Sequence, residues 1–107
     1  MDKRDFSQKE TFDFNDLKEL VAILRSPEGC PWDREQTHES IRNNFVEEAY
    51  EVCEGIDQKD DKLLCEELGD MLFQVLFHTS IASSEKRFEL EDVIGGICRK
   101  MIRRHPH

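Results

Sequence analysis

The sequence predicts an all-α fold, a four-helix bundle-like domain. Apolar residues recur three or four positions apart along almost the whole chain, which is the spacing of one face of an α-helix. No stretch shows the alternating pattern of a β-strand, and the chain contains no internal repeat. Its 107 residues fit one domain, or one subunit of an assembly.

The first expected helix covers residues 14–25 and follows a polar lead-in of residues 1–13. Its apolar stripe consists of Phe14, Leu17, Leu20, Val21 and Leu24. Two prolines and a glycine within residues 26–33 then indicate a turn-rich loop. Trp32 in this loop has two interpretations: a plug of the core, which is the commoner case, or a surface that stacks on a base.

Three further helices are expected over residues 37–56, 61–82 and 90–103, and Thr37 is a suitable N-cap for the first of them. The third helix of the chain is apolar almost all round between Met71 and Phe77, which implies burial on more than one side. A chain of this length cannot easily cover such a helix alone. We therefore expect a homodimer or a higher homo-oligomer.

The charge of the chain is strongly negative and unevenly distributed. Acidic residues outnumber basic ones by 24 to 15, a formal net charge of −9. Nucleic acids and anionic membranes attract basic surfaces, so we expect neither as a partner. Residues 47–70 carry ten acidic and two basic side chains, whereas residues 98–107 carry four basic side chains and no acidic one.

The sequence indicates a cytoplasmic protein. The first residues lack the apolar core of a signal peptide. The most apolar stretch, residues 71–77, is too short to span a bilayer. The four cysteines form no C-x-x-C pair, which favours reduced thiols over a zinc site.

Two pairs of acidic residues suggest a metal site. Glu48 and Glu51 stand three positions apart in the second expected helix, and Glu67 and Asp70 do so in the third. Residues so spaced share a helix face, and a short loop makes consecutive helices antiparallel, so the two pairs can converge. Four converging carboxylates repel one another unless a cation lies between them. Oxygen ligands favour Mg²⁺, with Mn²⁺ as a possible substitute, while a solvated acidic helix face is the alternative.

Other polar residues extend this pattern. Gln74 and His78 continue the row that Glu67 and Asp70 begin along the third helix. His78 is either a ligand or, more commonly for such a position, a hydrogen-bonded core histidine. Near the chain end, basic residues one turn apart either complement the C-terminus of the last helix or bind substrate phosphates: Lys100 and Arg104.

Four segments occur in an order that resembles the MazG-type nucleoside triphosphate pyrophosphohydrolases: Gly29–Asp33 (GCPWD), Glu47–Val52 (EEAYEV), Glu66–Asp70 (EELGD) and Arg103–His107 (RRHPH). The resemblance covers residues 14–107, which we expect to form one MazG-type domain. It implies the all-α MazG fold, a homodimer or higher oligomer, and hydrolysis of NTP or dNTP to the monophosphate and pyrophosphate, a house-cleaning role in the nucleotide pool. Many members carry two such domains and continue beyond the position of His107; a fragment of a longer protein is one interpretation of this difference, and the sequence leaves it open.

The resemblance also implies roles for individual residues. It places the metal motif of the family, with Mg²⁺ as the expected ion, on Glu48, Glu51, Glu67 and Asp70. Glu47 matches the first of two adjacent glutamates, and we take it as the candidate catalytic residue that orients or deprotonates the attacking water. Lys100 and Arg104 match basic residues that the family places near the phosphates.

Three other interpretations remain open from the sequence. The same fold can act on another substrate, such as dUTP or phosphoribosyl-ATP. A di-iron carboxylate bundle needs E-x-x-H on two helices, and only Glu35-x-x-His38 fits. The third interpretation is a non-catalytic acidic helical interaction module.

Overall fold

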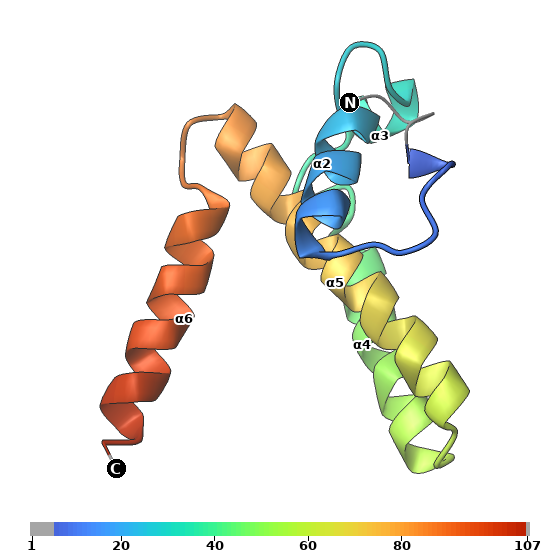
Figure 1. The fold of residues 1–107 in the computed structure, drawn as a ribbon, viewed down its shortest axis with the longest axis vertical. Helices are drawn as coiled ribbons and strands as arrows, with labels where there is room; N and C mark the ends of the chain where they lie inside the picture. Colours follow the sequence, from blue (N-terminus) through green and yellow to red (C-terminus); the bar gives the residue numbers. More distant parts are fainter. Residues whose placement is uncertain (1–5, 107) are drawn as a thin grey trace.

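The structure, a computed structural model, describes residues 6–106. This part of the chain contains no strand, and its helices are α2 (Phe14–Leu24), α3 (Pro31–Glu35), α4 (Arg42–Asp57), α5 (Asp61–Ser84) and α6 (Leu90–Arg104) (Figure 1). The all-α prediction is thus confirmed. Among these residues no helix combines the length and the apolar character needed to cross a bilayer.

Helix starts follow local capping chemistry. At α2, the Asp13 carboxylate accepts a hydrogen bond from the backbone N–H of Asp16, and the Asp16 carboxylate accepts one from the N–H of Asp13, both at 2.9 Å. The carboxylate of Asp60 caps α5 in the same way. The helices expected over 14–25, 61–82 and 90–103 all lie within two residues of those bounds.

The prediction that a helix starts at Thr37 was wrong. The Thr37 hydroxyl accepts a hydrogen bond from the N–H of Ser40 (3.1 Å), and the Ser40 hydroxyl accepts one from the N–H of Thr37 (2.8 Å). These bonds close a turn over residues 37–41, and α4 begins only at Arg42. Side chains that cap a helix also stabilise an isolated turn, so the residue type alone does not separate the two cases.

The turn-rich loop expected over residues 26–33 runs into the short helix α3, which the sequence analysis did not predict. Pro31 occupies the first helical position, where its missing N–H leaves no intrahelical bond unmade. Trp32 follows it and is 59% exposed. The interpretation of Trp32 as a plug of the core was therefore wrong.

The core lies where α5 meets its neighbours. One buried cluster joins Val21 of α2, Leu76 of α5 and Leu90 of α6, and Phe73 packs against it. Phe73 also packs against a second cluster formed by residues that precede α4 or belong to α5: Ile41, Phe77 and Ile81. The central helix α5 thus holds α2 on one side and the start of α4 on another (Figure 1).

Gly55 sets the distance between α4 and α5. A Cβ atom added there would lie 3.0 Å from both the backbone N and the Cα of Leu64 in α5. The absence of a side chain at Gly55 therefore allows the two backbones to approach closely. This contact aligns the acidic faces of the two helices.

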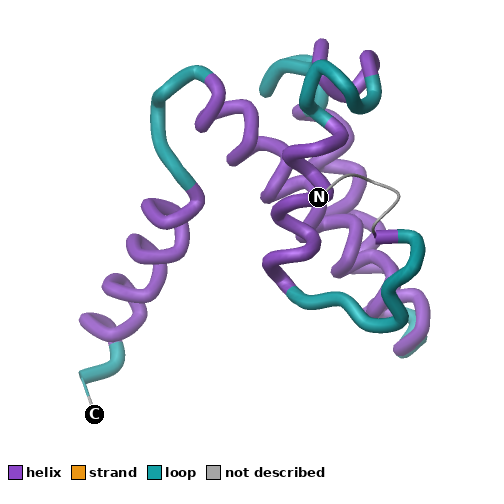
Figure 2. Tube along the Cα trace, turned by 45° about the horizontal axis from the view of Figure 1, so that its top comes forward, coloured by secondary structure: helices purple, strands orange, loops and turns teal. Residues whose placement is uncertain are grey.

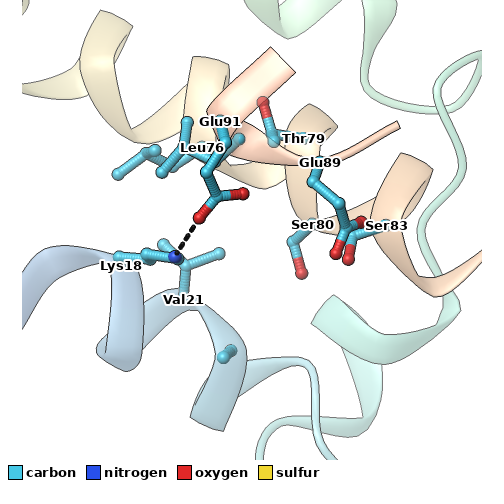
Figure 3. A pocket seen from close by; sticks show the side chains of 10 residues that line it. Lys18, Val21, Leu76, Thr79, Ser80, Ser83, Glu89 and Glu91 are labelled. Atoms are coloured by element: carbon cyan, nitrogen blue, oxygen red, sulfur yellow. Dashed lines mark hydrogen bonds and ion pairs between the residues drawn. The ribbon is translucent and has the colours of Figure 1, made fainter. Parts of the chain in front are cut away.

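Helix α6 leaves the bundle after its first turn. Leu90 is buried, and the Lys18 ammonium forms an ion pair with Glu91 at 3.4 Å. A pocket of about 180 Å³ lies at this joint, and Figure 3 shows the ion pair within its lining. Beyond the joint, α6 diverges from α4 and α5 in both Figure 1 and Figure 2. Large apolar side chains on it are exposed: Val93, Ile94, Ile97, Met101 and Ile102.

We expect Gly55→Ala to destabilise the protein. Overpacking against the Leu64 backbone costs about 1–3 kcal/mol, which outweighs the helix-propensity gain of about 1 kcal/mol. Gly96→Ala is the matched control, because nothing lies within 4 Å of its added Cβ. Urea unfolding should show a lower free energy of unfolding for the first variant and an unchanged or higher one for the second. Equal effects of the two substitutions would contradict the tight contact.

Candidate metal centre

Carboxylates from α4 and α5 converge on one place. One oxygen each of Glu48, Glu67 and Asp70 lies within 4.8 Å of the other two. Glu48 and Glu67 are half-buried and Asp70 is exposed. The antiparallel packing at Gly55 positions these side chains, because Glu48 lies two turns before Gly55 on α4 while Glu67 lies about one turn after Leu64 on α5. The two acidic pairs do meet, as their spacing led us to expect.

Glu51 belongs to the same group through Glu67. Its pKa is raised above the ordinary value, first by the hydrogen-bonding contact with the Glu67 carboxyl group and then by the negative charge of Glu67. The pKa of Glu48 is also raised, chiefly because burial disfavours its charged form. At Glu67 the contact with Glu51 lowers the pKa, but the contact with Glu48, burial and the neighbouring charges raise it overall. Burial and neighbouring carboxylates thus raise the pKa of three glutamates in the group: Glu48, Glu51 and Glu67.

Several buried oxygen atoms at this place lack a partner. Within the described part of the chain no donor reaches Oε2 of Glu48, Oε2 of Glu67 or Oε1 of Gln74. Buried polar atoms are nearly always hydrogen-bonded, so orphaned acceptors indicate a missing donor or cation. The atoms that could bind a metal here are all oxygens, which suits a hard divalent cation such as Mg²⁺. The residues present therefore fit a divalent metal ion.

The sequence analysis placed Gln74 in the polar row but not among the candidate ligands. Its carbonyl oxygen Oε1, like Oε2 of Glu48 and Glu67, is buried without a partner among the described residues. Its position four residues after Asp70 was the available signal, since i and i+4 share a helix face. The metal ligands expected from the sequence were carboxylates only, so the Gln74 amide was not among them.

Three predicted site residues do not join the group within one chain. Glu47 is exposed and is not one of the mutually close carboxylates. Lys100 and Arg104 are exposed on α6, which diverges from α4 and α5, and neither forms an ion pair with a described residue (Figures 1 and 2). The contacts within a single chain therefore do not account for the roles that the sequence predicted for these three residues.

His78, at the far end of the polar row, pairs with His38. Their Nδ1 atoms are 2.8 Å apart, the ring planes differ by 2°, and Phe45 contacts His78 at 74° with its centroid 5.8 Å away. Burial, and then the neighbouring His38, lower the pKa of His78 below its ordinary value, which disfavours the protonated ring. His78 is thus hydrogen-bonded, as in the commoner case that we considered, but it is half-buried rather than a core residue. Since His38 bonds His78 rather than a carboxylate, the geometry does not favour the di-iron alternative.

Residues 36–107 match the MazG nucleotide pyrophosphohydrolase domain. The chain is 53% identical over 94 residues to the nucleoside triphosphate pyrophosphohydrolase/pyrophosphatase MazG of Thermotoga maritima, and this match covers 88% of the chain. It is 46% identical over 97 residues, 87% of its length, to the nucleoside triphosphate pyrophosphohydrolase of Escherichia coli. An uncharacterised Bacillus subtilis protein, YabN, is 48% identical over 95 residues, 89% of the chain. The chain spans 37%, 37% and 19%, respectively, of the lengths of these relatives.

Divalent cations should stabilise the protein through the carboxylate group. We expect Mg²⁺ at about 100 times its Kd to raise the free energy of unfolding of chelator-treated protein by about 2.7 kcal/mol. Glu67→Gln should stabilise the metal-free form, because it removes repulsion, and should abolish most of the Mg²⁺ effect. Glu54→Gln is the control, since Glu54 lies on α4 outside the group and bonds Gln58. Thermal melts with and without Mg²⁺ measure both effects, and an undiminished Mg²⁺ effect in Glu67→Gln would exclude this site.

Acid should destabilise the protein through His78. Its folded-state pKa lies below the ordinary value of 6.5, so the unfolded chain takes up the proton first and stability is lost as the pH falls below that value. We expect the wild type to lose more stability than His78→Gln between pH 7 and pH 5, measured by urea unfolding in chelator. His105→Gln should keep the wild-type slope, because that ring is exposed at the residue that follows α6. A wild-type slope in His78→Gln would contradict the shifted pKa.

Proposed function

Because the chain belongs to the MazG nucleotide pyrophosphohydrolase family, we propose that it hydrolyses nucleoside triphosphates to the monophosphate and pyrophosphate in the presence of Mg²⁺. The observation that carries this proposal is the carboxylate group of α4 and α5 with its orphaned buried oxygens. The names of the Thermotoga maritima and Escherichia coli relatives support the same reaction. We further propose that it removes unwanted nucleotides from the cytoplasmic pool.

The four carboxylates have one task in this proposal. Mg²⁺ is to be held by Glu48, Glu51, Glu67 and Asp70, with the Gln74 carbonyl oxygen beside them. When bound, the ion neutralises phosphate oxygens and lowers the pKa of a coordinated water. The acidic residues themselves offset the positive charge of the ion and exclude other anions, so an acidic surface can accept a polyphosphate only together with its metal.

Glu47 is our candidate for the proton acceptor. It precedes Glu48 on α4 and is exposed, so solvent water reaches its carboxylate. In the reaction, the oxygen of water bonds to the α-phosphorus, the bond from that phosphorus to the bridging oxygen breaks, and pyrophosphate leaves. The proton of the water passes to the Glu47 carboxylate and from there to solvent.

Helix α6 supports the proposal of a homodimer. It carries exposed apolar side chains at helical spacing, among them Ile94 (43% exposed), Ile97 (48%) and Met101 (37%). The same helix ends in basic residues, whereas residues 47–70 are strongly acidic. A second copy that covers the apolar face brings Lys100 and Arg104 toward the acidic segment of the other chain. There the two cations offset charge on the substrate phosphates.

We expect pyrophosphate, rather than orthophosphate, to be released from NTPs with Mg²⁺. Asp70→Asn should lower kcat/KM by about 100-fold, equivalent to about 2.7 kcal/mol of transition-state stabilisation. Glu54→Gln, on the same acidic helix but outside the group, should leave kcat/KM unchanged. A coupled pyrophosphate assay on a panel of NTPs, dUTP and phosphoribosyl-ATP measures both rate and substrate class. Full activity of Asp70→Asn, or release of orthophosphate, would refute the proposal.

A further inference from the structure

An open pocket of about 490 Å³ lies at the junction of the turn over residues 37–41, the first turns of α4 and the middle of α5. Six residues line it: His38, Glu39, Arg42, Phe45, Val46 and His78. Three of them carry rings, and the charged side chains of Glu39 and Arg42 are exposed. None of these residues belongs to the carboxylate group. The roles proposed above for hydrolysis therefore do not involve this pocket.

The His38–His78 pair gives this pocket a flat surface. The ring planes are parallel to within 2°, and the centroids are 5.1 Å apart. Because the Nδ1 atoms are only 2.8 Å apart, this centroid separation corresponds to two rings that meet edge to edge through one hydrogen bond. The pair thus presents the area of a double ring. Phe45, inclined at 74° to His78, supports the pair from α4.

The pocket and the carboxylate group lie along the same two helices. On α5, the row Asp70, Gln74 and His78 rises about 12 Å from the first residue to the last. On α4, Phe45 precedes Glu48 by three residues, so both face the same side of the helix. A ligand whose phosphates lie at the carboxylates can therefore extend along these two helices toward the histidine pair.

We propose that this pocket binds the nucleobase of the substrate, which stacks on the coplanar His38–His78 pair while Arg42 and Glu39 contact its edge. The inference rests on the proposed function for the position of the phosphates. Neutral imidazoles and phenyl rings stack on any base, because every base has a π-face. The guanidinium of Arg42 offers donors and the carboxylate of Glu39 offers acceptors, so the rim can satisfy the polar edge of a base.

Binding of the reaction product AMP tests the pocket without requiring hydrolysis. The probe is AMP with Mg²⁺, and ribose 5-phosphate with Mg²⁺ is the matched ligand without a base. In the full chain, we expect AMP to shift the imidazole NMR signals of His38 and His78 upfield and to leave the signal of His105 unchanged. Ribose 5-phosphate should not produce these shifts. Equal shifts with the two ligands, or none with AMP, would overturn the inference.

Two variants separate stacking from folding. His38→Ala should weaken AMP binding by about tenfold and leave ribose 5-phosphate binding unchanged. His38→Phe keeps a flat ring and should restore most of the AMP affinity, which a purely structural loss would not explain. Wild-type AMP affinity in His38→Ala, with melting unchanged, would overturn the inference. Pyrophosphate release, measured in parallel, reports on the proposed function alone: AMP-induced shifts without any release would retain the base pocket and refute the hydrolysis.

Discussion

Close packing of α4 against α5 at Gly55 is the contact on which the rest of the structure depends. It allows two acidic helix faces to meet, although like charges in a half-buried space repel one another. The pKa of Glu51 is raised first by its contact with Glu67 and then by the charge of Glu67, whereas burial is the main cause at Glu48. Hydrophobic clusters around α5 hold the helices together against this repulsion. The fold thus uses its apolar core to maintain a concentration of negative charge.

The same molecule separates its negative and positive charge. Residues 47–70, in α4, α5 and the loop between them, carry ten acidic side chains, and residues 98–107 near the end of α6 carry four basic ones. Leu90 and the Lys18–Glu91 pair attach the start of α6 to the bundle. Helix α6 is therefore amphipathic without a covered apolar face in one chain. Apolar exposure of this extent is typical of an interface. In the homodimer that we propose, α6 would provide both the apolar contact between the copies and the basic side chains near the carboxylates.

Local patterns predicted the fold well. Apolar spacing placed three of the helices within two residues of their bounds, and the spacing of the acidic pairs predicted their convergence. Thr37 and Trp32 were misjudged, because a capping side chain or a large apolar one does not reveal whether a helix or a core surrounds it. The His38–His78 pair joins residues 40 positions apart through an irregular turn. No periodicity encodes such a contact, so only the folded chain could show it.

The Nδ1–Nδ1 bond also constrains the tautomers of the two rings. With both imidazoles neutral, the ring that donates from Nδ1 keeps Nε2 as an acceptor, and the ring that accepts at Nδ1 carries its proton on Nε2. The pair therefore always offers one outer acceptor and one outer donor. Exchange of the two protons with solvent interchanges these positions without moving a heavy atom. A surface of fixed shape can in this way match either of two opposite hydrogen-bonding patterns.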